Sequence, residues 1–209
     1  MVHVRTVNGE TEIFGNQGAL FMNAMTWWDT TTESVWSQVW GRAIEGPLKG
    51  TELELLPSQT IPWGSWKAQY PDTLFMTNGA GRMKFVGERF FPGYVIGVAL
   101  GDNAIAFPYE LAAQAGVIND NLGEVPVAAV VNRDTQAVGV FARAINEQTL
   151  TLHWDDENLR DEETGSTWDP TLGIAIAGTL KGEALRPIPY VPAFPSAWAD
   201  FYPQSEFYE

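Results

Sequence analysis

Cysteine is absent from this sequence of 209 residues. Disulfide bonds, thiolate metal sites and cysteine nucleophiles are therefore excluded. Histidine is almost absent too, because His3 and His153 are the only two. Two histidines without a thiolate make a poor ligand set for zinc. Thiol-based sites are therefore excluded, whereas His153 beside Asp155 or Asp156 stays a candidate metal ligand.

Long apolar runs are missing as well. The longest, VIGVAL and VPVAAVV, have the length of buried strands, and no stretch of about 18 uncharged apolar residues exists. The sequence thus predicts no membrane span. The first residues, MVHVRTVNGETEIF, lack the basic and apolar regions of a secretory signal, so we expect no signal peptide in this chain.

Basic residues are scarce. Twelve lysines and arginines face 26 aspartates and glutamates, which gives a net charge of −14, and residues 105–209 carry −11 of it. Such a surface repels phosphate backbones and anionic lipid heads, so neither nucleic acid nor a membrane surface is an expected partner. The hydrophobic content of 45% predicts a globular protein with a substantial core.

What the sequence does contain is a duplication. Residues 29–75 and 161–207 align without a gap at an offset of 132, with 17 identities in 47 positions. This period is far longer than that of a solenoid, so the copies are tandem homologous units. In first-copy numbering the identical residues are Asp29, Thr32, Ser34, Trp36, Gly41, Ala43, Ile44, Gly46, Leu48, Lys49, Gly50, Leu53, Pro57, Trp66, Tyr70, Pro71 and Phe75.

The first copy is shorter than the second. Upstream of the aligned block the copies still match at an offset of 138, where Arg5 and Asn8 align with Arg143 and Asn146. Before Arg143 the second copy continues back through residues 95–142, whereas the first has only residues 1–4 there. We therefore predict a partial first repeat at 1–76, a linker at 77–94 and a complete second repeat at 95–209, packed as one globular unit.

Local patterns predict a mainly β fold, a β-rich α+β arrangement of two tandem homologous units with short helices, the first unit lacking its leading strands. Residues 95–108 are typical of two strands around a Gly-Asp-Asn turn, and residues 109–116 of a short helix. Residues 117–131 and 137–145 predict further strands. Residues 174–189 alternate like a hairpin, and 196–203 predict a helical turn that a proline ends.

Several ordered motifs carry a family resemblance. They are DTTTESVWSQVWGRAIEGPLKGTELELLP, its echo DEETGSTWDPTLGIAIAGTLKGEALRPIP, and the segment VIGVALGDNAIAFPYELAAQAGVINDNLGEVPV. Over nearly its whole length the chain resembles the family catalogued as domain of unknown function 3179. The resemblance implies no established activity, and it allows an extracytoplasmic location.

The chain departs from that family in two respects. Members typically have a full first repeat, in which a strand runs into a Cys-Pro-x-Cys motif shortly before a Phe-x-Arg, and this chain begins after that point. In the second repeat, Asn132 and Thr135 occupy the positions that correspond to those cysteines. Thiol chemistry of the family is therefore absent here.

The short first repeat predicts a partner. If each repeat needs its leading strands to complete a sheet, the first repeat presents an unpaired edge and an uncovered apolar face, which natural proteins avoid. We expect these strands to come from a second copy of the chain in a homo-oligomer, or from a separate chain.

A motif repeated in both copies offers the first candidate site. Read functionally, two pseudo-symmetric carboxylates beside hydroxyls and indoles suit a sugar-binding cleft or an acid/base pair, with Asp29, Asp161 and Glu163 as catalytic candidates. Read structurally, the same residue types form turns that satisfy their own backbone, and the tryptophan anchors the core. The motif comprises Asp29, Thr32, Ser34 and Trp36, repeated as Asp161, Thr164, Ser166 and Trp168.

An acidic run around residues 155–163 offers a second. Calcium prefers oxygen ligands of this kind, but the spacing does not match an EF-hand loop. A solvated charged face is the alternative interpretation. As ligands of a divalent cation, calcium or similar, the candidates are His153, Asp155, Asp156 and Asp161.

Nine tryptophans provide a third feature. Two duplicated pairs, Trp36 with Trp168 and Trp66 with Trp198, are typical of core residues. Four of the five unpaired ones lie in the first repeat and are candidates for a platform that stacks a ligand or binds a partner, together with Ser34 and Ser166. These four first-repeat residues are Trp27, Trp28, Trp40 and Trp63.

Three functional hypotheses follow. The leading one is a non-catalytic binding or assembly module that another chain completes. The alternatives are a carboxylate-dependent hydrolase, with glycans as one substrate class, and a divalent-cation-binding protein.

Overall fold

The computed structural model describes residues 1–74 and 93–209. Strands make up 46% of the structure and helices 11%, which confirms the mainly β expectation. No helix among the described residues is long and apolar enough to cross a membrane. The described helices are α1 (Trp63–Gln69), α2 (Tyr109–Ala115) and α3 (Pro195–Phe201).

The second repeat forms three four-stranded sheets and a small hairpin. Their strand orders are β21-β9-β10-β22, β11-β12-β13-β20, β16-β17-β18-β19 and β14-β15. Most pairs are antiparallel, while β22 joins β10 in parallel. The strands are β9 (Val95–Leu100), β10 (Asn103–Pro108), β11 (Val117–Leu122), β12 (Val125–Val131), β13 (Val138–Ala142), β14 (Ala144–Ile145), β15 (Gln148–Thr149), β16 (Leu152–Asp155), β17 (Asn158–Asp161), β18 (Thr167–Trp168), β19 (Ala175–Ala177), β20 (Arg186–Pro187), β21 (Val191–Ala193) and β22 (Glu206–Phe207).

The first repeat reproduces the later part of the second. Its sheet β4-β5-β6-β7 has the order of β16-β17-β18-β19, and its hairpin β2-β3 corresponds to β14-β15. The remaining strands, β1 and β8, pair with each other. The strands are β1 (Val2–His3), β2 (Thr6–Val7), β3 (Glu10–Thr11), β4 (Phe14–Phe21), β5 (Ala24–Asp29), β6 (Val35–Ser37), β7 (Arg42–Glu45) and β8 (Leu55–Leu56).

The pairing of β1 with β8 shows which strand of the second repeat β1 corresponds to. Val2 pairs with Leu56, and the residues at the corresponding second-repeat positions, Val140 and Ile188, are joined by a hydrogen bond from the Ile188 N–H to the Val140 carbonyl. β1 thus corresponds to the later part of β13. The first repeat, as far as it is described, has no counterparts of β9, β10, α2, β11 and β12.

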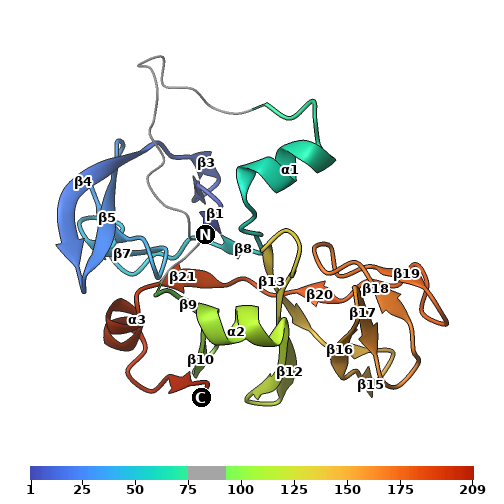
Figure 1. Ribbon diagram of the computed structural model, residues 1–209. Coiled ribbons are helices and arrows are strands. Elements are labelled where there is room, and N and C mark those ends of the chain that lie inside the picture. Colours follow the sequence, from blue (N-terminus) through green and yellow to red (C-terminus); the bar gives the residue numbers. More distant parts are fainter. Residues whose placement is uncertain (75–92) are drawn as a thin grey trace.

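The two repeats share a core. Trp40 and Phe21 of the first repeat meet Phe201 of α3, with ring centroids 5.0 and 6.0 Å apart from it respectively. The same apolar cluster includes Val39 and Trp198. In Figure 1 the blue first-repeat sheet lies beside the red helix α3. Of the predicted linker 77–94, only Gly93 and Tyr94 lie within the described residues, and Phe75 of the aligned block lies outside them.

One predicted hairpin is present, but its arms also join other sheets. The alternation over residues 174–189 predicts a hairpin, but β19 pairs with β18 and β20 pairs with β13. The two arms also bond to each other, through the Ile174–Ala184 bridge and through the bonds from the Ala175 N–H to the Glu183 carbonyl, from the Gly182 N–H to the Ala175 carbonyl and from the Leu185 N–H to the Gly173 carbonyl. The first arm, β19, also joins the sheet of β18, and the second arm, β20, joins the sheet of β13.

Candidate functional site

Each repeat contains the same hydrogen-bonded turn around an aspartate. In the first repeat, the carboxylate of Asp29 accepts hydrogen bonds from the Thr32 N–H and hydroxyl, from the Ser34 N–H and from Trp36 Nε1. The indole nitrogen lies 2.9 Å from Asp29 Oδ2, and Asp29 is fully buried. The side chains of this turn therefore satisfy its backbone and the core indole together.

The second repeat repeats these contacts. Asp161 accepts bonds from the Thr164 N–H and hydroxyl, and from Trp168 Nε1, again at 2.9 Å. The buried hydroxyl of Ser166 accepts the Leu180 N–H at 3.0 Å. Its counterpart Ser34 accepts the Leu48 N–H at the same distance. Both serines therefore connect the aspartate turn to the loop that follows β7 or β19, and neither hydroxyl faces solvent.

The surroundings of Asp29 favour the ionised form of its carboxyl. Burial by itself raises the pKa of the Asp29 carboxyl, but the hydrogen bonds from Trp36, Thr32 and Ser34 outweigh it and hold this pKa below its ordinary value. A general acid needs the opposite, a carboxyl whose pKa is raised toward neutrality. The contacts of Asp29 are those of a structural carboxylate.

The first-repeat candidate Asp29 does not lie beside the two second-repeat candidates. Asp29 ends β5 in the blue sheet, whereas Asp161 ends β17 in the orange sheet on the opposite side of the molecule (Figure 1). Glu163 accepts a hydrogen bond of 2.8 Å from the Thr151 N–H. Carboxylate pairs in glycosidases lie roughly 5–10 Å apart across one bond of the substrate. A catalytic role for any of the three stays a prediction from sequence.

The cation candidates lie along the β16–β17 hairpin. His153 stands opposite Arg160, which forms an ion pair of 3.3 Å with Asp155. Asp156 lies in the turn between the strands, with a φ of 51°. Within residues 1–74 and 93–209, no group of three or more histidines and carboxylates is arranged to hold a metal ion. Divalent-cation binding rests on the sequence alone.

The unpaired tryptophans occupy different surroundings. Trp27 packs edge-on against His3, with centroids 5.5 Å apart, and Trp28 lies half-buried beside Gly15. Trp40 contacts α3 and is covered by the guanidinium of Arg42, 4.2 Å from its ring centroid. Trp63 is 49% exposed. The structure thus distributes the four over several surfaces, and Trp40 binds the second repeat of its own chain.

The helices α1 and α3 are equivalent in sequence and in local structure. Trp66 Nε1 donates to the Thr73 hydroxyl at 3.1 Å, and Trp198 Nε1 donates to the Ser205 hydroxyl at 2.7 Å. Trp66 and Tyr70 have ring centroids 4.2 Å apart at 34°, and the second-repeat pair has centroids 4.3 Å apart at 31°. Each indole is therefore held in the same orientation by its own short segment.

Their burial differs completely. Trp198 is 0% exposed and packs on Gly97 of β9, where a Cβ atom would come within 2.3 Å of the indole ring. Trp66 is only half-buried, and α1 has no buried residue. The expectation that both tryptophans are core residues was wrong for Trp66. The reason is that its covering strand, the counterpart of β9, is not among the described residues of the first repeat.

The backbone just before α1 also has N–H and carbonyl groups that no described residue pairs, at the positions where a counterpart of β9 would pair. Residues 59–61 correspond to β21, which pairs with β9. Thr60 uses its N–H and carbonyl toward the second repeat, where they meet Tyr190 Oη and the Val138 N–H. Polar groups alternate in direction along a strand, so those of Gln59 and Ile61 point the other way. They have no hydrogen bond with any residue in the described ranges.

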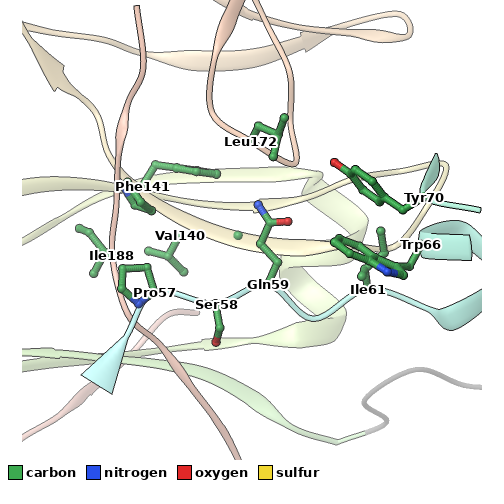
Figure 2. Close-up of a pocket in the computed structure, with 12 residues that line it drawn as sticks. Pro57, Ser58, Gln59, Ile61, Trp66, Tyr70, Val140, Phe141, Leu172 and Ile188 are labelled. Carbon is green, nitrogen blue, oxygen red and sulfur yellow. The ribbon is translucent and has the colours of Figure 1, made fainter. Parts of the chain in front are cut away.

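We call this surface the α1 face: the rings of Trp66 and Tyr70 with the open backbone of Gln59 and Ile61. A groove of about 590 Å³ adjoins it. Figure 2 shows Trp66 and Tyr70 at one end of this groove and Phe141 at the other, with Gln59 between them. The lining is mostly apolar. The α1 face therefore combines an apolar side with backbone groups that no described residue pairs.

Comparison with known families decides what the chain is related to. The profile of the family described as protein of unknown function (DUF3179) matches residues 1–90 and 92–205. The chain belongs to this family. The two matched segments agree with the duplication seen in this DUF3179 chain. Searches of curated proteins and of solved structures give no match.

Sequence reasoning about this DUF3179 protein missed Trp66 and the edge at Gln59 and Ile61. A signal was present: Trp66 aligns with Trp198, and the sequence already lacked a counterpart for the segment 95–100 that covers Trp198. An aligned core residue whose covering segment is missing is expected to be exposed.

Proposed function

We propose that this protein is a non-catalytic binding or assembly module whose first repeat is completed by another polypeptide at the α1 face. The observation that carries the proposal is the contrast between Trp198, which is fully buried, and its equivalent Trp66, which is half-buried with the same local bonds. A large aromatic side chain held rigidly at a surface is a favourable anchor for a partner.

Two further features support the α1 face as the surface that binds the partner. Leu74, at the position equivalent to Glu206 of β22, is 96% exposed. It adds an exposed apolar side chain four residues after Tyr70, and large exposed apolar patches mark interaction sites. The acidic charge of the chain adds a second preference, for a partner that carries a neutral or basic rim around its apolar contact.

The alternatives have less support. Hydrolase chemistry would need carboxylates that share a site, and the candidates Asp29 and Asp161 are engaged in separate turns. We therefore retain binding or assembly as the function that the geometry favours.

Native mass spectrometry of the protein isolated from its own source tests this proposal. We expect a mass greater than that of one chain, either as a homo-oligomer or with a second polypeptide. Trp66→Ala should shift the population toward the single chain, because it removes the aromatic anchor of the interface.

Lys67→Gln is the matched control, since Lys67 is an exposed residue on the same helix. It should leave the mass distribution unchanged. A monodisperse single chain at micromolar concentration, for the natural protein as isolated, would refute the proposal.

A further inference from the structure

The second repeat shows what covers a helix of this type. In its own sheet, β9 pairs antiparallel with β21, with Gly97 opposite Val191, Ile96 opposite Pro192 and Val95 opposite Ala193. At the glycine, the strand passes directly under the indole of Trp198. Only a residue without a Cβ permits that approach.

The same three positions exist in the first repeat. Gln59, Thr60 and Ile61 align with the three residues of β21, and Trp66 aligns with Trp198. Since the local geometry of α1 matches that of α3, a strand paired with residues 59–61 in the register of β9 would place its glycine opposite Gln59 and beneath Trp66.

We propose that the partner at the α1 face adds a β-strand to the edge formed by Gln59 and Ile61, and that this strand carries a glycine beneath Trp66 flanked by valine, isoleucine or alanine. This inference rests on the proposed function and specifies its partner. The binding mode is β-strand addition, in which main-chain hydrogen bonds give affinity and side-chain positions give specificity.

The chemistry of the edge supports a strand as the occupant. The N–H and carbonyl groups of Gln59 and Ile61 need partners with strand spacing, which an extended chain supplies and a helix does not. The incoming strand must also lack a side chain beneath Trp66, because an indole that lies directly over a backbone leaves room only for glycine in that position. The groove that adjoins the α1 face is lined mostly by apolar residues, which suits a partner with apolar side chains.

A peptide with the sequence of the chain's own β9–β10 segment, VIGVALGDNAIAFP, is the probe. Two lysines added at its C-terminus provide solubility. Isothermal titration calorimetry against the full chain should show binding. The same peptide with leucine in place of its glycine, equivalent to Gly97→Leu, should bind at least about tenfold more weakly, because the leucine side chain meets the indole.

Variants of the protein locate the binding site. Trp66→Ala should weaken binding of the peptide by about tenfold or more, and Lys67→Gln should leave it unchanged. Gln59→Pro should also weaken it, because proline removes the N–H that donates to a carbonyl of the incoming strand. Each variant is first shown by its melting temperature to be folded, which is expected because Trp66 and Gln59 lie outside the core.

Three results would overturn the inference: no binding up to about 1 mM, equal binding of the glycine and leucine peptides, or unchanged binding to Trp66→Ala. Its failure can be told apart from failure of the proposed function. An assembly in native mass spectrometry without peptide binding rejects strand addition and leaves the assembly role standing. Peptide binding to a protein that is a single chain in its own source rejects the assembly role.

Discussion

Trp198→Ala is expected to destabilise the protein by about 4 kcal/mol, whereas Trp66→Ala should cost only about 1 kcal/mol in the isolated chain. Both residues occupy the same helix position, stack on a tyrosine and donate to a hydroxyl. They differ because a strand covers Trp198 and none of the described residues covers Trp66 in this way. The difference between the two losses of unfolding free energy therefore measures what burial beneath that strand contributes.

Urea unfolding of the two variants beside the wild type measures this difference. Only Trp198→Ala leaves a cavity against Gly97 and the apolar cluster shared by the repeats. Equal losses of unfolding free energy would mean that Trp66 is as well packed as Trp198. That result would contradict an exposed α1 face.

Gly178→Ala is expected to cost about 4 kcal/mol, because two separate penalties add. Gly178 has a φ of 91°, a conformation that costs an L residue about 1–2 kcal/mol. In addition, the new Cβ would lie 2.6 Å from the Cα of Ser166, which cannot move without disturbing the aspartate turn. Overpacking of this kind costs about 1–3 kcal/mol more.

Gly182→Ala is the matched control for this prediction. Gly182 has a φ of 94° in the same loop, yet no atom lies within 4 Å of the position that a Cβ would take there. It should therefore lose only the backbone penalty, about 1 kcal/mol. The first repeat offers a replicate, since Gly46 and Gly50 have the same contrast. Equal losses at Gly178 and Gly182 in thermal unfolding would show that the close contact with the aspartate turn has no energetic weight.

Much of the fold could be predicted from the sequence, because the relevant signals are local. The Gly-Asp-Asn turn between β9 and β10, the helix α2 and the proline that follows α3 each depend on residues within a few positions of one another. The duplication added long-range information, because identical residues at a fixed offset implied identical units. The shared sheet order of β4-β5-β6-β7 and β16-β17-β18-β19 follows from it.

The pairing of β19 and β20 with strands outside residues 174–189 could not be predicted in the same way. Alternation places residues on two faces of a strand but does not name the neighbouring strand. Here Arg186 and Pro187 pair with β13, more than 40 positions earlier in the chain, and local pattern carries no information about that contact.

The surroundings of Trp66 lay beyond local reasoning for a related reason. Identity with Trp198 indicated a core residue, but burial depends on what lies opposite, and Gly97 has no described counterpart in the first repeat. The turns around the repeated aspartates, by contrast, could be predicted from the local sequence. Asp29 and Asp161 find their partners within seven residues, so the turn could be proposed from spacing alone.

Amide hydrogen exchange at Gln59 and Ile61 tests the central claim most directly, by comparing the protein assembled as isolated from its own source with the chain alone. We predict that both amides exchange at least about tenfold more slowly in the assembly, because an added strand pairs with them. The Thr60 amide is the internal control, since it already donates to Tyr190 Oη and should not change. Unchanged exchange at Gln59 and Ile61 in an intact assembly would contradict strand addition at the α1 face.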